Sequence, residues 1–169
     1  MGWLQPIIDF LRQFWPFEIV YSYQRGVRFW CGRDTAELDA GLYMFLPFFA
    51  RIEVLDTQMD VMRLANQDLT TKDGVGIATA VNVLYEIHDA RAAFVNVQKV
   101  VDNIADECRT GVAKAVRQYD FAELLSKQSD IENDIADQVA HVAGEWGVQI
   151  HRVNFADFIK TKAISLMRA

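Results

Sequence analysis

Residues 77–89, IATAVNVLYEIHD, change their pattern once, and that change decides the fold. Up to His88 the chain alternates strictly between two sets of side chains, which predicts a half-buried β-strand. Asp89 then precedes ARAAFVN, residues 90–96, and aspartate is a favoured N-cap at the start of a helix. One set consists of Ile77, Thr79, Val81, Val83, Tyr85 and Ile87, and the other of Ala78, Ala80, Asn82, Leu84, Glu86 and His88.

The chain before this strand carries further strand and turn signals. β-Branched and aromatic residues are frequent there, and Gly, Pro and Asp mark the breaks between the runs. The segments are EIVYSYQRGVRFW (18–30), GLYMFLPFF (41–49), ARIEVLDTQMDVMRL (50–64) and the turn TTKDGVG (70–76). One side of the third segment is predicted to hold Ile52, Val54, Met59 and Val61. Short loops between neighbouring strands favour a mostly antiparallel sheet.

The chain after residue 89 has mainly helical periodicity. The predicted helices are 90–96, about 98–118, FAELLS at 121–126 and a helix that ends at Gly144. Two pairs have capping-box spacing at the starts of the last two helices, Asp120 with Glu123 and Ser129 with Glu132. WGVQIHRVNFADF, residues 146–158, returns to alternation. Strands, then helices, then one returning strand predict an α+β domain, in which a mostly antiparallel sheet packs with several helices.

A bulky apolar segment, WLQPIIDFLRQFWPF, occupies residues 3–17. Asp9 and Arg12 interrupt it, which argues against a secretory signal and a simple membrane span. Helical spacing instead predicts an amphipathic helix that ends at Pro16. Its apolar face either packs on the protein's own core or lies in a bilayer interface, where Trp is favoured. The residues of the segment alone do not decide between these two locations. That face consists of Trp3, Leu4, Ile7, Ile8, Leu11, Phe14 and Trp15.

Composition and charge are those of a folded protein of about one domain. The chain has 169 residues, of which 51% are hydrophobic and 24% charged, enough for a sizeable core. A net charge of −6 argues against a nucleic-acid partner, because phosphate binding needs a concentrated basic face. Residues 1–33 carry +2, from four Arg against Asp9 and Glu18, and the remainder therefore carries −8. The basic excess lies beside the apolar segment, on the side that would face anionic lipid.

No catalytic or metal-binding pattern stands out. Gly74 and Gly76 begin like a dinucleotide-binding loop, but Thr79 occupies the third glycine position and a strand follows, so a turn is favoured. Three histidines have no metal-ligand spacing: His88, His141 and His151. Three carboxylates fall on the solvated face of one predicted helix: Glu132, Asp134 and Asp137. We therefore predict no enzymatic activity, no metal and no cofactor.

Cys31 and Cys108 lie far apart and form no CxxC motif. They could form one disulfide, but two reduced core thiols are favoured, in a reducing, cytoplasmic compartment. Cys108 falls on the apolar stripe of the helix at 98–118, where thiols are usually inert. A Cys–His nucleophile nevertheless stays open as an alternative.

In their order along the chain, these segments resemble an SPFH (band 7) domain, the module shared by stomatins, prohibitins and flotillins, and stomatins are the most similar group. The resemblance covers about residues 20–160. At Ala40 and Ala90 the family usually has proline, and Gln128 and Ser129 also depart from its pattern. The motifs are YQRGVRFWCGR (23–33), GLYMFLPFF (41–49), LTTKDGVGIATAVNVLYEIHDA (69–90), DFAELLSKQSDIENDIADQV (120–139) and AGEWGVQIHRVNFADF (143–158).

The resemblance implies a non-catalytic, membrane-associated scaffold. Such proteins form homo-oligomers, organise lipid microdomains and regulate membrane partners or proteases. The N-terminal helix stands where this family has its membrane anchor, so we expect it to lie in one leaflet with both termini on the cytoplasmic side. The loop at 46–49 is similar to one that enters lipid in some members, although as a sequence it is equally a turn packed in the core. This adds Phe48 and Phe49 to the seven membrane-associating residues of the helix.

Three regions are predicted: a membrane-associating helix at 1–17, an SPFH domain at 18–160 and a short tail at 161–169. An alternative is a soluble interaction module that regulates a protease or another client, with the first helix packed on its own sheet. A hydrolase that uses Cys108 or the helix carboxylates is a third hypothesis, for which the sequence suggests no substrate.

Overall fold

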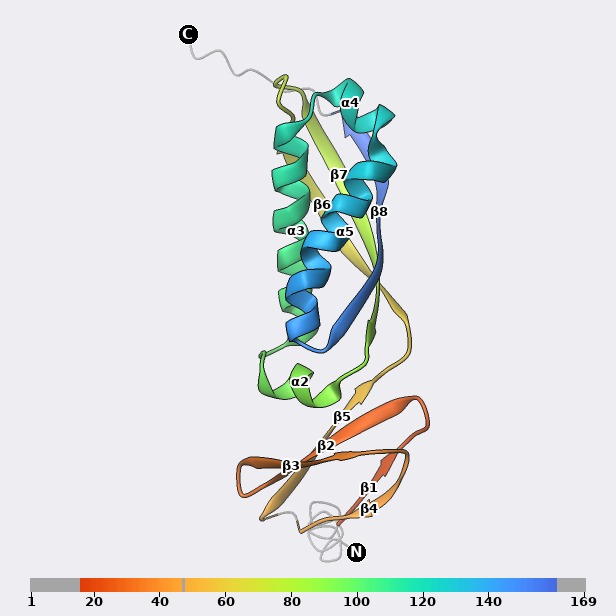
Figure 1. The fold of residues 1–169 in the computed structure, drawn as a ribbon, viewed down its shortest axis with the longest axis vertical. Helices are drawn as coiled ribbons and strands as arrows, with labels where there is room; N and C mark the ends of the chain where they lie inside the picture. Colours follow the sequence, from red (N-terminus) through yellow and green to blue (C-terminus); the bar gives the residue numbers. More distant parts are fainter. Residues whose placement is uncertain (1–15, 47, 161–169) are drawn as a thin grey trace, which may run out of the picture. The chain divides into compact units, whose positions relative to one another are not determined.

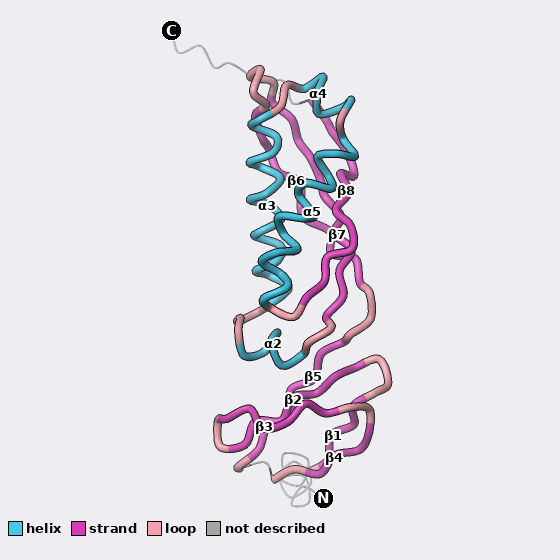
Figure 2. Tube along the Cα trace, viewed as in Figure 1, coloured by secondary structure: helices cyan, strands magenta, loops and turns pink. Residues whose placement is uncertain are grey.

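The computed structural model describes residues 16–46 and 48–160. The N-terminal helix predicted over 1–17, apart from its last two residues, and the tail at 161–169 lie outside these ranges, and the three-region division stays a prediction. Contacts divide the chain into two compact units, Met1–Gln58 and Met59–Ala169, whose described residues are coloured red to orange and yellow to blue in Figure 1. The described part is α+β, with antiparallel strand pairs and four helices, which confirms the predicted fold class (Figure 2).

The first unit contains two small sheets rather than part of a single one. A two-stranded ribbon is formed by β1 (Phe17–Val20) and β4 (Gly41–Met44). A three-stranded sheet has the order β3 (Arg33–Leu38), β2 (Gln24–Trp30) and β5 (Ala50–Asp56). The strand predicted over 18–30 is therefore two strands, divided by a turn in which Gln24 N–H donates to Tyr21 O at 2.9 Å. The sequence did not indicate β3, because RDTAEL lacks alternating apolar residues and becomes a strand by pairing with β2.

Gly26 allows close packing inside this unit. A Cβ at this position would lie 3.2 Å from Val20 Cγ2 and 3.3 Å from Leu38 Cβ, tighter than ordinary van der Waals contact. Val20, Val27 and Leu38 are buried and form the core of the unit. Close packing therefore explains why glycine follows Arg25 in the first motif, since a larger residue at position 26 would separate β1 and β3 from β2.

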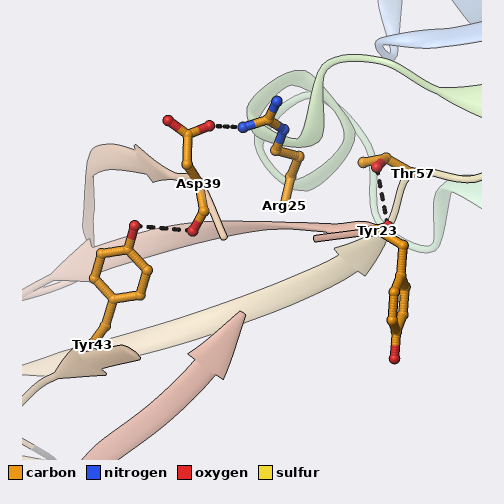
Figure 3. A network of polar contacts seen from close by, with 5 residues as sticks. All are labelled: Tyr23, Arg25, Asp39, Tyr43 and Thr57. Carbon is orange, nitrogen blue, oxygen red and sulfur yellow. Dashed lines mark hydrogen bonds and ion pairs between the residues drawn. The ribbon is translucent and has the colours of Figure 1, made fainter. Parts of the chain in front are cut away.

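Asp39, between β3 and β4, fixes the orientation of the ribbon (Figure 3). Its carboxylate forms an ion pair with Arg25 of β2, and its carbonyl oxygen accepts a hydrogen bond of 2.9 Å from the Tyr43 hydroxyl. Successive residues of a strand point to opposite sides. Because Tyr43 is held on one side of β4, Leu42 and Met44 project from the other.

The second unit is a three-stranded sheet with helices on one face. The strand order is β6 (Asp60–Thr70), β7 (Gly76–Ile87) and β8 (Val148–Lys160). The long helices α3 (Val100–Gln118) and α5 (Gln128–Glu145) pack against each other and against this sheet, as Figure 1 shows. Two short helices complete the unit, α2 (Ala90–Val95) and α4 (Phe121–Ser126).

The alternation predicted over 50–64 is wrong as one continuous pattern. The segment is divided between β5 and β6, which belong to different units. Met59 and Val61 are both exposed, contrary to the prediction that they share a buried side with Ile52 and Val54. The predicted alternation was continued across Thr57–Met59, where the chain passes from one sheet to another and a new alternation begins.

The strand predicted from the alternation over residues 77–88 is confirmed as β7. Every second residue of β7 from Ile77 to Ile87 is buried, and the intervening residues are partly exposed. The helix start is also confirmed, because the Asp89 carboxylate accepts a hydrogen bond of 2.8 Å from Ala92 N–H. This half of the chain therefore forms where its local pattern indicates.

Two bulges keep the apolar side chains of β8 on one face. His151 is an extra residue opposite β7, between the paired residues Ile150 and Arg152. This explains why Ile150 and Val153, three positions apart, are both buried. A second extra residue, Ala156, shifts the register again. Without these shifts the strict period of two would place part of the apolar side chains of β8 on the face of the sheet opposite the helices.

The two predicted capping boxes have different outcomes. At α4 the box is present, with Glu123 Oε2 accepting from Asp120 N–H at 3.3 Å. At α5 the prediction is wrong, because the helix already begins at Gln128 and Ser129 lies inside it. The Glu132 carboxylate instead accepts a hydrogen bond of 2.7 Å from Phe155 N–H, which ties α5 to β8.

The end of α5 also differs from the prediction. The helix continues through Gly144 to Glu145. The left-handed residue is Gly147, with φ +73°. Its carbonyl oxygen accepts hydrogen bonds from the backbone N–H groups of His88 at 3.0 Å and Asp89 at 3.1 Å. Gly147 thus joins the start of β8 to the end of β7.

Candidate membrane-facing surface

The β1–β4 ribbon presents an apolar side to solvent. Phe17 pairs with Met44 and Ile19 with Leu42 across the two strands, so the four side chains share one side. All four are exposed, and Met44 is 74% exposed. We call these four residues the ribbon face. Together with Glu18 and Tyr21, three of them line a shallow, mainly apolar depression.

The turn that follows β4 carries two further exposed aromatic residues. Phe48 is 77% exposed and Phe49 is 57% exposed. The turn is held in place, because Phe49 N–H donates to Leu46 O at 2.9 Å and Cys31 N–H donates to Phe49 O at 2.7 Å. The rings of Phe49 and Trp30 stack, with centroids 6.4 Å apart. We call Leu46, Phe48 and Phe49 the aromatic turn.

The aromatic turn begins beside the residue at which the N-terminal segment joins the described chain. Phe45 N–H donates a hydrogen bond of 2.8 Å to Pro16 O, which extends the β1–β4 pairing by one bond. Pro16 follows directly on residues 1–15. The two segments predicted to contact a membrane are thus adjacent at their points of attachment, although 28 residues lie between Pro16 and Phe45 in the sequence.

Exposed large apolar side chains are unevenly distributed between the units. In the described part of the chain, ten lie within residues 16–58 and five within residues 59–160, although the second range is more than twice as long. Soluble monomers rarely expose contiguous apolar patches of this kind unless they bind a partner or a membrane. The first unit is therefore the candidate interaction surface.

The residues predicted to bind membrane are only partly within the described ranges. Phe48 and Phe49 lie on the aromatic turn and are exposed. The ribbon face was not among the predicted residues, and its signal in the sequence is the apolar alternation in FEIV and GLYM. The seven predicted residues of the N-terminal helix lie outside the described residues: Trp3, Leu4, Ile7, Ile8, Leu11, Phe14 and Trp15.

The two cysteines occupy different environments, and both are free. Cys108 is buried as predicted, and this burial raises the pKa of its thiol to about 12. A thiol with such a pKa holds its proton at neutral pH and is a weak nucleophile. Cys31 is exposed, so the prediction that it is a core thiol is wrong. It lies in a turn with φ 49°, directly after Trp30.

Gly74 lies in a turn, as predicted, and Gly76 is the first residue of β7. Gly74 has φ +80°, and Thr71 N–H donates to Val75 O at 3.0 Å. The Asp73 carboxylate accepts a hydrogen bond from the Thr71 hydroxyl, which lowers the pKa of Asp73. The strand β7 follows directly, so the segment lacks the helix N-terminus that a dinucleotide-binding loop provides.

The acidic residues of α5 do not form a catalytic pair. Asp134 and Asp137 are exposed, as the predicted solvated face requires. Glu132 is half-buried and bound to Phe155 N–H and the Gln128 amide, so its expected solvation is wrong. Within residues 16–46 and 48–160 no group of three or more His, Cys, Asp or Glu side chains is arranged to hold a metal ion.

None of the helices in the described ranges is both long and apolar enough to cross a bilayer.

Known proteins resemble most of this chain. The profile described as "SPFH domain / Band 7 family" matches residues 18–165. A stomatin homolog of Pyrococcus horikoshii is 24% identical over 140 residues, which cover 83% of this chain and 53% of that protein. Stomatin-like protein 1 of Homo sapiens is 22% identical over 157 residues, 92% of this chain and 39% of that protein. The chain therefore spans about half the length, or less, of these relatives.

Proposed function

Since this chain belongs to the SPFH domain / Band 7 family, we propose that it is a non-catalytic scaffold that associates with a membrane and self-assembles there. On this proposal it lies on the cytoplasmic face, where it organises lipid microdomains or regulates a membrane partner or protease. The observation that carries the proposal is the exposed apolar surface of the first unit, which consists of the ribbon face and the aromatic turn.

The aromatic turn has the chemistry of a shallow membrane contact. Phe48 offers a large apolar side chain at the tip of a turn whose backbone is fixed by hydrogen bonds. Trp30 stacks on Phe49 and is itself exposed, and Trp is enriched at bilayer interfaces because its ring is amphipathic. A fixed turn loses little conformational entropy when it enters lipid, so more of its apolar transfer energy is available for binding.

The N-terminal segment supplies the second contact in this proposal. Its predicted amphipathic helix joins the described chain at Pro16, which is hydrogen-bonded to the first residue after β4. Interfacial binding commonly needs two signals, because a single short apolar element gives only marginal affinity. The adjacency of the two segments therefore supports binding by both together.

Basic residues in the first unit make a smaller contribution. The excess of +2 over residues 1–33 favours an anionic lipid surface. Arg25, however, forms an ion pair with Asp39, which reduces its net attraction to lipid phosphate. We therefore expect apolar contact to dominate, with only a modest dependence on salt.

Flotation of the full chain with vesicles that contain anionic lipid tests the membrane contact. Removal of the Phe48 side chain in Phe48→Ser loses roughly 2 kcal/mol of apolar burial, and so about thirtyfold in affinity. Val95→Ser is the matched control, because Val95 is an exposed apolar residue of the second unit. We expect wild type and Val95→Ser to float, and Phe48→Ser to require higher lipid concentrations.

Deletion of residues 1–15 tests the second contact in the same assay. We expect the shortened chain to bind vesicles at least as weakly as Phe48→Ser, and its combination with Phe48→Ser to abolish flotation. If wild type remains in the aqueous phase at every lipid concentration, the membrane proposal is wrong. That outcome would favour the soluble interaction module.

A further inference from the structure

One face of the β6–β7–β8 sheet is covered by α3 and α5, and the opposite face is open. The side chains of β7 that point away from the helices remain partly exposed, although β7 is the central strand of its sheet. They include two small residues, Ala78 and Ala80, which leave room for another element to approach closely. We use the name open face for the surface that includes six residues of this side of the sheet: Val61, Arg63, Ala80, Asn82, Leu84 and Arg152.

Two arginines form a basic spot at one end of the open face, while farther along the sheet Asp68 pairs in register with Ala78 and Asp157 with Ala80. Arg63 pairs in register with Asn82, and Arg152 with Leu84, so the two guanidinium groups lie on either side of β7. Neither arginine forms an ion pair with a residue in the described ranges. On the same face Glu86 is already paired with His151 at 3.0 Å. An unpaired cationic pair on an uncovered sheet is suited to an acidic partner.

The outer side of α5 has the complementary charge. Asp130, Asp134 and Asp137 are exposed and follow one line along the helix, at spacings of four and three residues. None of them forms an ion pair with another described residue. The helix carries no Lys or Arg between Gln128 and Glu145, so nothing along it neutralises this line.

We propose that the acidic side of α5 in one copy docks on the open face of the β6–β7–β8 sheet in the next copy. The inference rests on the proposed self-assembly and assigns to it a surface and a partner, a second copy of this chain. The docked helix would place Asp134 and Asp137 near Arg63 and Arg152. It would also cover the apolar side chains of Leu84 and Val61 and give the sheet a helical layer on both faces.

The geometry makes this contact heterologous. The acidic helix and the open face lie on opposite sides of the same two-layer unit, so each copy has one of each to offer its neighbours. Contacts of this type continue from copy to copy and give rings or filaments rather than closed dimers. Three strands of eleven or more residues present a face of roughly 500 Å², less than the roughly 800 Å² that one partner contributes to a standard interface, which places a single contact of this kind among the weak ones.

Charge reversal on each surface tests the proposal in the full chain bound to vesicles. The first variant, Arg63→Glu with Arg152→Glu, makes the open face acidic. The second, Asp134→Arg with Asp137→Arg, makes α5 basic. Because each variant opposes like charges, we expect its self-association to weaken by at least about tenfold relative to wild type. Cross-linking and negative-stain microscopy measure the assembly, and circular dichroism confirms that the variants are folded.

Mixing the two variants gives the decisive measurement. In the mixture each acidic surface again meets a basic one, so assembly is expected to return, with the two variants alternating. A control with the same change in charge, Lys72→Glu with Lys99→Glu, lies off both surfaces and should assemble as wild type does.

Normal assembly of both reversal variants would overturn the docking proposal and leave the scaffold proposal intact. Loss of assembly without recovery in the mixture would also overturn it, because the surfaces would then not be partners. A wild-type chain that binds vesicles but never assembles would instead refute self-assembly itself.

Discussion

Replacement of Gly147 by alanine tests why a glycine stands where α5 ends and β8 begins. Its φ of +73° lies in the left-handed region, which costs an alanine about 1–2 kcal/mol. A Cβ would also lie 2.4 Å from the carbonyl oxygen of Asp89 and 2.8 Å from Asp89 Cβ. Asp89 is poorly placed to move away, because its N–H and that of His88 both donate to Gly147 O and its carboxylate caps α2.

The expected effect combines these contributions. Relief of the overlap would weaken two backbone hydrogen bonds, each worth about 1 kcal/mol, and the cap at Asp89, worth about 1 kcal/mol. With the conformational cost, we expect Gly147→Ala to lower the free energy of unfolding by about 3–5 kcal/mol. That is a large part of the roughly 5–15 kcal/mol by which a domain is usually stable.

Urea unfolding of the full chain, followed by far-ultraviolet circular dichroism, measures this loss against two other glycines. Gly74 has φ +80° with no atom within 4 Å of the added Cβ, so Gly74→Ala should cost only the conformational 1–2 kcal/mol or so. Gly144 is helical with equally open surroundings, so Gly144→Ala should gain up to about 1 kcal/mol. If Gly147→Ala is no more harmful than Gly74→Ala, the junction accommodates a Cβ and the steric argument is wrong.

Three further predictions concern titratable groups. At pH 8 a thiol reagent should modify the exposed Cys31 quickly and Cys108 only after unfolding, because burial raises the pKa of Cys108 to about 12. Burial, with the nearby Asp60, also raises the pKa of Tyr85. Cys108 and Tyr85 should therefore both contribute stability that is complete below about pH 9 and is lost progressively toward pH 12. Cys108→Ala should reduce this alkaline loss of stability, and a stability profile equal to that of wild type would contradict the prediction. The hydrogen bond from Thr71 lowers the pKa of Asp73, so Thr71→Val should raise that pKa in an NMR titration, and no change would show that the contact is not maintained in solution.

The sequence predicts elements well where one local pattern determines them. β7 and the Asp89 cap follow from strict alternation and from a single aspartate. It fails where pairing partners decide the structure, as in β3, which has no apolar alternation, and in the division between β5 and β6. Glu132 was assigned to a capping box because its spacing from Ser129 is right, but Phe155, 23 residues later, supplies the donor that it binds.

Prediction of the candidate surface from the sequence is limited in the same way. Phe48 and Phe49 are predicted from the resemblance of the loop at 46–49 to a lipid-entering loop of the family, because as a sequence this loop is equally a turn packed in the core. The ribbon face was missed because its two halves, around Ile19 and Leu42, are short and far apart in the sequence, and only the β1–β4 register brings them onto one side. A pattern of two apolar residues in a four-residue strand does not say which side will be covered.

The hydrogen bond from Phe45 to Pro16 has a kinetic consequence for the proposed anchor. Two lipid contacts attached at adjacent points act as a bivalent ligand: while one is inserted, it holds the other at an effective concentration on the order of millimolar. Release then requires both contacts to detach before either inserts again. Two contacts of modest affinity could in this way give a long residence time, and a change that breaks only one of them would shorten it steeply.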